Sequence, residues 1–419
     1  MSEPNSVEVA VIGAGIVGLA CALQLQMDGR RVAIVDPNEP ASGCSHGNAG
    51  YLAEGHVFPP AALVPLSRLP KILFDPLGPL VLRAAYLPRM IPWALRAAAI
   101  LRPAALPRVL DAIAALNRLS IDSYDPLLDA AQARDLMERK GSLMVYRTPS
   151  SLDAAAARMP AIRERGLRVE RVDAAQLREL EPALLPGLAG AIHYPDSGRC
   201  LNPRGLGQRF ADALAAGGAQ FHRATATRLL PQDGGGWRIE TREAPALKAK
   251  KIVVSAGAIS DRLLRPLGYK VPLAAERGYH LMLAPQPHIA LCRPVSTGEH
   301  FFTMTPMEHG FRLAGTAEFA DFDAPMDPRR ADLLLELAKL YLPELNGQGA
   351  TRWMGARPSM PDGLPAIGQA HRHADLYYCF GHQHLGLTQA AISARIMGHL
   401  VAGSPPPIDA RPYALSRFD

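Results

Sequence analysis

Short apolar runs that end in a glycine or an acidic residue alternate with helical patterns at the start of the chain. Residues 7–12 form a β-branched run typical of a buried parallel strand. Apolar residues then recur at helical spacing from 19 to 28, and Gly29 suits the C-terminal end of that helix. A second apolar run, 31–36, ends in a carboxylate. The pattern predicts two parallel strands joined by a helix.

The turn between the first strand and the helix carries a glycine pattern that suits a dinucleotide. Gly13 allows a tight turn, Gly15 lets backbone amides approach a pyrophosphate, and Gly18 lets the helix pack closely on the sheet. The N-terminus of the helix adds partial positive charge. Asp36 ends the second strand, where it can accept hydrogen bonds from ribose hydroxyls and would repel a 2′-phosphate. NADP is therefore disfavoured.

Two later segments are expected to return to the same sheet. Asn202 and Pro203 suit a helix cap and a first helical residue, and their helix is expected to reach about residue 216. Strands are expected at about 219–229, 237–241, 251–255 and 376–380, and a C-terminal helix is expected from Thr388 to about residue 400. The sequence has no second G-x-G-x-x-G pattern, so we expect no separate NADH domain.

The other segments predict a second, α+β domain that binds the substrate. Its mixed sheet is expected to contain residues 141–147, 190–194, 276–283 and 311–316, covered by helices at 152–165 and 329–340. The predicted fold class is α/β, with a Rossmann-like domain and an α+β domain built on this mixed sheet. The Rossmann-like domain is discontinuous, at 1–55, 200–268 and 350–419, and the substrate domain takes 56–199 and 269–349.

Composition places the chain among ordinary globular enzymes. It has 419 residues, of which 48% are hydrophobic and 20% charged. Its five cysteines are scattered without a C-x-x-C pair, so we expect a reducing compartment, no disulfide framework and no metal site. A net charge of +6 is too mild to indicate nucleic acid. No secretory signal or membrane-spanning run is visible, and the expected location is the cytoplasm.

Four separated blocks resemble the D-amino acid oxidase superfamily of FAD-dependent oxidoreductases, and most closely its bacterial D-amino acid dehydrogenase branch (small-subunit type). The blocks are the glycine turn at 13–18, the loop at 43–51, the segment 355–368 with its Gly-Ala-Arg-Pro sequence, and the loop at 381–388; the closing residues 413–418 agree with them. The resemblance covers nearly the whole chain. It implies non-covalent FAD, because the cysteine that holds flavin in sarcosine oxidases is absent near 357 and His46 is only adjacent to a position used elsewhere.

The resemblance also implies the cofactor contacts. The ADP half would be held by Gly13, Gly15, Ile16, Val17, Gly18 and Asp36, and the adenine side would be contacted by Ala226, Ala256 and Gly257. The phosphate and flavin edge would be contacted by Ser45, Asn48, Ala49 and Gly50. The flavin ring would be contacted by Gly381, His384, Gly386, Leu387 and Thr388. The helix that follows Thr388 would direct its positive end toward the charge that a reduced flavin carries. A simple strand-to-helix turn is the alternative for these last glycines.

Arg357 is the residue that the resemblance assigns to the substrate carboxylate. A guanidinium fork holds a carboxylate by two parallel bonds; the alternative is a structural ion pair with Asp362. Tyr279 either shares the carboxylate or is a core tyrosine with a satisfied hydroxyl. The other catalytic candidates are His46, His382 and His384, any of which could accept the ammonium proton; ordinary packed histidines are the alternative.

The expected reaction is hydride transfer from the substrate Cα to flavin N5, which yields an imine or, from a cyclic imino acid, a pyrroline. The loop at 381–388 looks somewhat like that of D-hydroxyproline dehydrogenases, so D-hydroxyproline or D-proline is the leading substrate hypothesis. The electrons would pass to a quinone or another non-nicotinamide acceptor. An oxygen-using oxidase that resembles sarcosine or glycine oxidase, and a non-catalytic flavoprotein subunit, are the alternatives.

Residues 56–110 form a proline-rich, basic segment with seven basic residues against the single acid Asp75. Apolar residues such as Trp93 and Ile100 lie between the arginines. The mixture suits a surface that touches an anionic membrane and meets a quinone, which would make the protein peripheral on the inner face of the cell membrane. A helical cap over the active site, with its arginines facing water, is the alternative.

Overall fold

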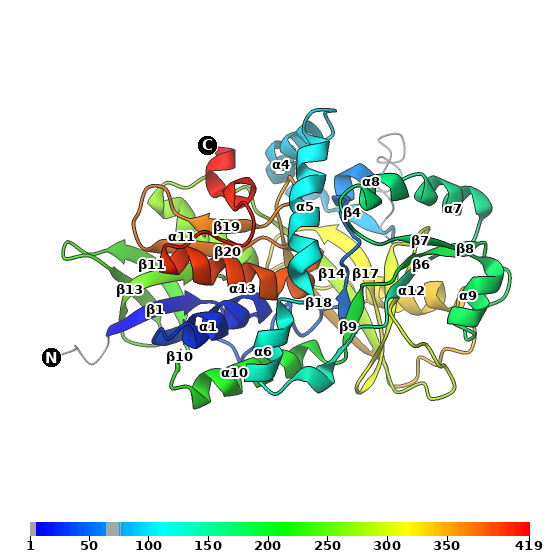
Figure 1. Cartoon of the computed structure of the whole chain (residues 1–419), viewed down its shortest axis with the longest axis horizontal. Coiled ribbons are helices and arrows are strands. Elements are labelled where there is room, and N and C mark those ends of the chain that lie inside the picture. Colours follow the sequence, from blue (N-terminus) through cyan, green and yellow to red (C-terminus); the bar gives the residue numbers. More distant parts are fainter. Residues whose placement is uncertain (1–5, 64–74, 76) are drawn as a thin grey trace.

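The computed structural model describes residues 6–63, 75 and 77–419, and in these residues two large β-sheets lie side by side (Figure 1). The first sheet carries the helices α1, α10 and α13. The second sheet carries α7, α9 and α12. This arrangement confirms the predicted fold class, a Rossmann-like domain beside an α+β domain with a mixed sheet.

The first sheet is built around four buried parallel strands. Its strands are β1 (Ser6–Ile12), β2 (Val32–Val35), β10 (Gln220–His222), β11 (Thr225–Pro231), β12 (Trp237–Arg242), β13 (Leu247–Val254), β19 (Ala366–Gln369) and β20 (Leu376–Phe380). Their order is β10-β2-β1-β13-β12-β11, and β20 pairs with the last residues of β13 in place of β12. Both β2 and β20 are buried throughout, which explains their continuous apolar runs.

Three helices cover one face of this sheet, and their ends follow the sequence signals. They are α1 (Ile16–Met27), α10 (Pro203–Ala216) and α13 (Gly386–Ala402). The Asn202 side chain accepts a hydrogen bond from the amide of Gly205 at 2.8 Å and so caps α10. Gly29 follows α1 with a φ of +82°, a conformation that glycine adopts without strain. The predicted start of α10 is confirmed, whereas α1 and α13 begin three and two residues before the predicted positions 19 and 388.

The predicted strand at 219–229 is wrong, because the segment forms two strands with different partners. β10 pairs in parallel with β2, whereas β11 pairs antiparallel with β12. Between them the amide of Ala224 donates to the carbonyls of Asp36 and His222, which turns the chain. Apolar residues alternate at 219 and 221 and again at 224 and 226, so the phase of the pattern changes at this turn, and that change was the available signal.

The second sheet contains antiparallel and parallel pairs. Its strands are β4 (Leu80–Leu82), β6 (Ser142–Tyr146), β7 (Glu170–Asp173), β8 (Gly190–Tyr194), β14 (Ala274–Leu283), β15 (Val295–Thr297), β16 (Phe302–Met307), β17 (Gly310–Phe319) and β18 (Thr351–Ser359). Their order is β18-β14-β17-β16-β15-β6-β8-β7, with β4 on β17. The helices around it are α7 (Pro149–Ala156), α8 (Met159–Arg163), α9 (Ala174–Leu180) and α12 (Pro328–Lys339), whereas α11 (Ser260–Leu264) packs on β11 of the first sheet. The helix predicted at 152–165 is therefore two helices, and Pro160 lies in the first turn of the second.

Two features cross the predicted domain boundary. β18 lies in the segment that was assigned to the FAD domain from residue 350, yet it hydrogen-bonds β14 in the second sheet. The helices α5 (Leu106–Ser120) and α6 (Tyr124–Ala130) lie in the predicted substrate segment, yet they pack on α13 and α1 of the first domain. A small sheet of β3 (Tyr51–Leu52), β5 (Met137–Glu138) and β9 (Gly198–Cys200) joins the two parts.

The basic segment 56–110 is described only in part, because residues 64–74 and 76 lie outside the described residues. The described part contains α2 (Pro60–Leu63), β4 and α4 (Leu87–Ala99). Met90 and Ala97 of α4 are buried, whereas Leu87, Ile91 and Leu95 of the same helix are exposed. In the described parts of the chain, no helix combines the length and the apolar character that crossing a bilayer requires.

Candidate functional site

Two glycines of the first turn are required by packing, and a third is not. A Cβ on Gly13, which has a φ of +111°, would lie 2.3 Å from the carbonyl oxygen of Ser255, and a Cβ on Gly18 would lie 2.0 Å from that of Gly13. A Cβ on Gly15 would meet nothing nearer than Ser45 Oγ at 3.5 Å. Protein atoms therefore do not fill the space beside Gly15, which leaves room for a ligand to approach the backbone.

The start of α1 and the end of β2 form a polar edge beside this space. Gly15 caps α1 without a side-chain hydrogen bond, and the amide of Ile16 donates to Ser45 Oγ at 2.8 Å. Asp36 accepts from the amides of Ala14 and Asn38, both at 2.8 Å, so its carboxylate is fixed at the C-terminal end of β2. The helix dipole and the fixed carboxylate suit the phosphates and a ribose of a dinucleotide.

The loop at 43–50 is held on this edge by a buried arginine from β17. Nη1 of Arg312 donates to the carbonyls of His46, at 2.9 Å, and Asn48. Burial lowers the pKa of Arg312 to about 10, which leaves it charged at neutral pH. The Asn48 side chain accepts from the amide of Gly50 at 2.8 Å. Asn48 thus shapes the loop, and Arg312 fixes the loop to the second sheet.

Several residues that were predicted to contact FAD border open space. Gly257, with a φ of +56°, has no protein atom within 4 Å of an added Cβ, and that of Gly386 would meet only His382, at 3.8 Å. Ala49, Ala226 and Ala256 are half-buried. Gly381 differs from these glycines, because its Cβ would lie 2.7 Å from Met360. Space remains beside these positions, as a bound flavin dinucleotide requires, so the residues present fit this group.

The first turn of α13 is tied to the rest of the protein through buried contacts. Thr388 Oγ1 accepts from the amide of Ala53 at 3.0 Å, and the carbonyl of Leu387 accepts from the Tyr124 hydroxyl. Both Leu387 and Thr388 are buried. Their side chains serve the packing of this turn, so these residues could contact a flavin ring only through their backbone atoms.

Arg357 projects from β18 on the face of the second sheet that also carries Glu276. Its Nη1 donates to Glu276 Oε1 at 2.9 Å, and Ser359 Oγ donates to Glu276 Oε2 at 2.6 Å. A Cβ on Gly278 would lie 2.3 Å from Nη2 of Arg357 and 2.5 Å from its Nε. The guanidinium is thus anchored at one edge by Glu276 and laid against the backbone of β14, and a quarter of the side chain (25%) stays exposed.

The predicted alternative partner of Arg357 is wrong. Asp362 forms its ion pair with Arg417 near the C-terminus, at 2.6 Å. Glu276 is the carboxylate that faces Arg357, because the two residues are direct partners in the pairing of β14 with β18. Burial raises the pKa of Glu276, but the Arg357 charge and the Ser359 hydroxyl outweigh this effect and lower it below the usual value. The pair is therefore ionised at neutral pH.

Of the three candidate histidines, His384 is the one placed beside this pair. His384 is exposed in the structure. Desolvation lowers the pKa of its imidazole; the Glu276 charge opposes this shift and the Arg357 charge adds to it. The ring is therefore neutral at physiological pH and can accept a proton.

His382 and His46 are placed differently. His382 is buried, and its Nε2 lies 2.9 Å from Ser393 Oγ on α13. His46 lies beside Trp353, with ring centres 6.4 Å apart, and its buried Nδ1 has no hydrogen-bond partner. The packed-histidine alternative describes His382, whereas His46 keeps one nitrogen available.

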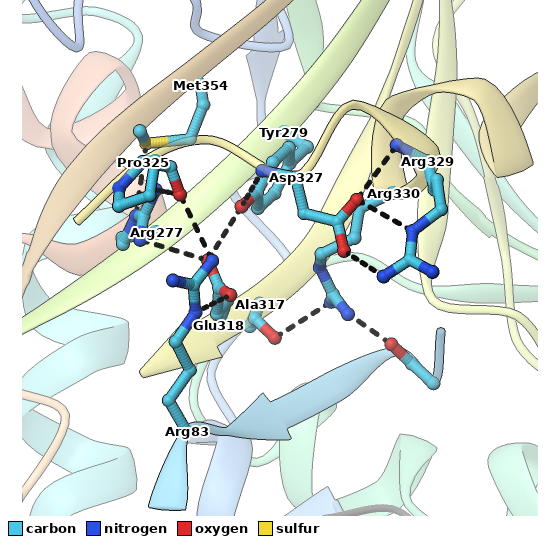
Figure 2. A network of polar contacts seen from close by, with 11 residues as sticks. Arg83, Arg277, Tyr279, Ala317, Glu318, Pro325, Asp327, Arg329, Arg330 and Met354 are labelled. Carbon is cyan, nitrogen blue, oxygen red and sulfur yellow. Dashed lines mark hydrogen bonds and ion pairs between the residues drawn. The ribbon is translucent and has the colours of Figure 1, made fainter. Parts of the chain in front are cut away.

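Tyr279 lies on the opposite face of β14 from Arg357. Its hydroxyl donates to Glu318 at 2.6 Å, and its ring is buried in the core of the second sheet. Figure 2 shows Tyr279, Arg83 and Arg277 converging on Glu318. The structure therefore shows the alternative that the sequence offered, a core tyrosine with a satisfied hydroxyl. Tyr279 packs in the core of the second sheet, on the face of β14 opposite Arg357.

Sequence reasoning missed Glu276, Gly278 and Arg312. The first two lie two positions apart in a strand that is buried almost throughout, and an acid and a glycine at that spacing are unusual in a core strand. That spacing was the available signal. Arg312 had no such signal, because its partners lie more than 260 residues away in the sequence.

The family profile described as "FAD dependent oxidoreductase" matches residues 8–400 of the chain. The chain belongs to this family. Its cofactor is therefore FAD, which agrees with the open glycine positions beside α1 and α13. The family membership also makes the protein an enzyme of the oxidoreductase class.

Curated relatives align with this chain over nearly its full length. A D-amino-acid oxidase of Bradyrhizobium diazoefficiens is 33% identical and aligns with 99% of this chain and 100% of its own. A D-amino acid dehydrogenase of Rhizobium johnstonii is 31% identical over 98% of this chain and 100% of its own. Among solved structures, glycine oxidase from Geobacillus kaustophilus has the same fold, with a TM-score of 0.76 at 22% identity and 99% coverage of both chains.

Proposed function

We propose that this FAD-dependent oxidoreductase dehydrogenates a D-amino acid or a cyclic D-imino acid, with D-hydroxyproline or D-proline as the leading substrates. The observation that carries the proposal is the Arg357 guanidinium, anchored by Glu276 and laid on Gly278 beside His384. The names of the two curated relatives support a D-amino acid substrate. The choice of a cyclic imino acid comes from the loop at 381–388.

In this proposal Arg357 binds and orients the substrate carboxylate. Nη1 is engaged by Glu276, so the carboxylate would take the remaining donors of the fork. Because Gly278 and Glu276 fix the guanidinium, the bound acid presents one face of its Cα. When bound, FAD accepts a hydride from that carbon. Non-covalent attachment agrees with a site that is lined by backbone and small residues.

His384 is the proposed acceptor of the proton that the substrate nitrogen loses. A neutral amine is needed, because its lone pair assists departure of the hydride from Cα. The imidazole is uncharged at neutral pH, and the charges of Arg357 and Glu276 both influence its pKa. The N-terminus of α13 adds partial positive charge at the same side, which would stabilise a reduced, anionic cofactor.

Anaerobic mixing with D- and L-amino acids and cyclic imino acids tests the substrate proposal. Loss of the flavin absorbance with D-proline or D-hydroxyproline, and little or none with the L-isomers, is the expected result. Arg357→Ala should slow this reduction at least about 100-fold, since it removes a charged bidentate contact. Arg352→Ala is the matched control, because Arg352 lies on the same strand but pairs with Asp332 at the surface. A flavin that no amine or amino acid reduces would contradict the proposal.

We further propose that electrons leave to a quinone at an anionic membrane on the cytoplasmic side. The support is α4: Leu87, Ile91 and Leu95 are 50%, 53% and 69% exposed along one side of the helix, and Arg89 and Arg96 flank them. Phe322 and Met326 are also exposed on a loop that Arg83 and Arg89 bind. An apolar stripe with basic flanks suits the interface of an anionic bilayer.

Vesicle sedimentation tests this second proposal. The protein should bind phosphatidylglycerol vesicles more strongly than phosphatidylcholine vesicles, and Ile91→Ser with Leu95→Ser should weaken binding at least about fivefold. Phe221→Ser is the control, since Phe221 is an exposed apolar residue on β10. Equal binding by the α4 variant and the control would contradict a role for this helix.

An oxygen-using oxidase is the second candidate function. It is favoured by the name of the relative from Bradyrhizobium diazoefficiens. Turnover in air separates the two functions: stoichiometric hydrogen peroxide supports the oxidase, whereas slow reoxidation by oxygen and fast reoxidation by a quinone analogue supports the dehydrogenase.

A further inference from the structure

We propose that His56 forms a hydrogen bond with a hydroxyl group of the substrate, so that the site selects 4-hydroxy-D-proline over D-proline. The inference rests on the proposed function, because it specifies which of the substrates named there the site prefers. In this arrangement Arg357 holds the carboxylate, His384 faces the ring nitrogen and His56 contacts the hydroxyl. His56 is thus a substrate-binding residue that determines specificity.

The loop that carries His384 is attached to the strand that carries Arg357. Ser359 of β18 forms an isolated antiparallel bridge with His382. Arg357 lies two residues before the first of these bridge partners, and His384 lies two residues after the second. The charge of Arg357 influences the pKa of the His384 imidazole, which agrees with this proximity. The carboxylate site and the exposed His384 therefore belong to the same end of β18.

His56 lies next to His384, on a segment that is bound to the start of α13. The amide of Ala53 donates to Thr388 Oγ1 at 3.0 Å, so residues 53–56 run beside the loop at 381–388. The rings of His56 and His384 are tilted, with centres 6.4 Å apart. His384 is exposed and His56 is partly exposed, so protein atoms enclose neither ring. Two imidazoles at this separation do not bond each other directly but can bind two groups of one small ring.

Buried partners hold His56 in place. Its Nε2 lies 3.3 Å from the Tyr51 hydroxyl, and that hydroxyl lies 2.8 Å from Ser142 Oγ. The Tyr194 ring stands edge-on to His56, with ring centres 5.7 Å apart. Nδ2 of the buried Asn117 donates to the carbonyl of His56 at 3.2 Å. Both the ring and the backbone of His56 are fixed, so a contact with a ligand costs little additional ordering.

The other ring nitrogen of His56 suits a hydroxyl group. Nδ1 has no hydrogen-bond partner in the part of the chain that the structure describes. Burial, and to a lesser degree His384, lower the pKa of His56 to about 3, so the neutral ring carries one N–H. Nδ1 donates where Nε2 accepts from Tyr51, and it accepts where Nε2 donates. A hydroxyl serves both cases, whereas an ammonium group only donates and a carboxylate only accepts.

The order of the three side chains matches the order of groups in 4-hydroxyproline. In that molecule the ring nitrogen adjoins the carbon that bears the carboxylate, and one ring carbon separates it from the carbon that bears the hydroxyl. In the site, His384 adjoins Arg357 on one side and His56 on the other. Three fixed contacts determine how the ring lies and which C4 epimer presents its hydroxyl to His56. D-Proline forgoes the third contact.

Anaerobic flavin reduction of the holoenzyme by D-proline and by both C4 epimers of 4-hydroxy-D-proline tests the assignment. The wild type should prefer one epimer over D-proline by at least about tenfold in the second-order rate constant. His56→Leu should slow reduction by that epimer at least about tenfold and change reduction by D-proline less than about twofold. His56→Gln, whose amide also donates and accepts, should keep more of the preference than His56→Leu. Equal slowing with all three substrates would show a structural role and would overturn the inference.

Another histidine–tyrosine pair supplies matched controls. Nδ1 of His300 lies 2.7 Å from the Tyr341 hydroxyl, in a partly buried contact. His300→Leu and Tyr341→Phe should both keep the wild-type preference between the substrates. Tyr51→Phe should weaken the preference, because Tyr51 is a positioning residue that orients the His56 ring. A preference that is the same in His56→Leu as in the wild type would overturn the inference.

Unreactive acids separate this inference from the proposed function. Tetrahydrofuran-2-carboxylate and its 4-hydroxy derivatives have an ether oxygen in place of the ring nitrogen, and their binding is followed by the change in flavin absorbance. The wild-type holoenzyme should bind one hydroxy acid at least about fivefold more tightly than the parent acid, whereas His56→Leu should bind the two equally. This comparison decides the role of His56 even where no amino acid reduces the flavin. Equal binding of the acids by the wild type, or none, would overturn the inference.

Discussion

The guanidinium of Arg357 lies so close to the backbone of Gly278 that a Cβ on the glycine would stand 2.3 Å from Nη2. We therefore expect Gly278→Ala to displace the guanidinium from its place beside Glu276. FAD content should stay normal, whereas the KM for the substrate should rise at least about tenfold. Steady-state kinetics and the absorbance ratio of flavin to protein measure both quantities.

Gly234→Ala is the control for this substitution. Gly234 lies in the turn between β11 and β12, where no atom lies within 4 Å of an added Cβ. It should leave KM and flavin content unchanged. An unchanged KM in Gly278→Ala would show that Arg357 does not need this position to hold the substrate.

The first two glycines of the turn at 13–18 should respond differently to alanine. Gly13→Ala should destabilise the fold by about 1–3 kcal/mol, because the residue has a φ of +111° and its Cβ would strike the Ser255 carbonyl. Gly15→Ala should leave the apoprotein as stable as the wild type but weaken FAD binding. Thermal denaturation of both apoproteins, followed by FAD titration, checks the pair. Loss of stability in Gly15→Ala with normal FAD affinity would contradict our assignment of the open space.

Asp36→Ala should yield mainly apoprotein. The carboxylate accepts from the amides of Ala14 and Asn38, so its removal disturbs the turn and takes away the expected partner of a ribose. Asp28→Asn, at the other end of α1, is the control for a lost acid on the same βαβ unit. The FAD released by acid precipitation measures occupancy, and the same step checks that attachment is non-covalent. Full occupancy in Asp36→Ala would count against the ribose contact.

Glu276→Gln should impair the substrate site without removing the cofactor. The change leaves the Arg357 charge without its carboxylate and should lower the free energy of unfolding by about 1.5–3 kcal/mol. Flavin reduction should slow, because the guanidinium loses its anchor at one edge. Urea denaturation and stopped-flow reduction measure the two effects. Stability and rates equal to those of the wild type would show that Glu276 is dispensable.

Glu54 predicts a pH dependence of stability. Burial and the nearby charges of Asp196 and Asp122 raise the pKa of Glu54 from an ordinary 4.5 to about 7 in the folded protein. Between these values the folded state holds a proton that the unfolded chain releases, so this residue makes the protein less stable as the pH rises. Glu54→Gln should raise the Tm by about 1–4 °C at pH 8 and leave it unchanged at pH 4. A Tm gain that is equal at both pH values would contradict this origin.

The Rossmann-like part could be predicted because its signals are local. Gly13, Gly15, Gly18 and Asp36 lie within one βαβ unit, and their spacing determines which of them meet. The cap of α10 by Asn202 is equally local. The limits of this reasoning appear at residues 219–229, where two short strands that were predicted as one pair with different neighbours.

The substrate side could be predicted only in part, because the residues that meet there depend on strand register. Arg357 faces Glu276 since β14 and β18 pair residue for residue in that register. The face that Tyr279 takes depends on the same pairing and on an irregularity between Gly278 and Tyr279 opposite β17. Neither the partner of Arg357 nor the face that Tyr279 takes can be obtained from the sequence of the strand alone.

The position of β20 in the middle of the first sheet has a consequence for synthesis of the chain. The last residues of β13 pair with β20, and the loop with His384 follows β20 directly. At ordinary rates of translation a ribosome needs roughly 20–75 s to proceed from the glycine turn to this loop. Throughout that time the nascent nucleotide sheet lacks a central strand and cannot retain the coenzyme. Newly made chains should therefore depend on chaperones until the final helix emerges, and flavin starvation should prolong that dependence.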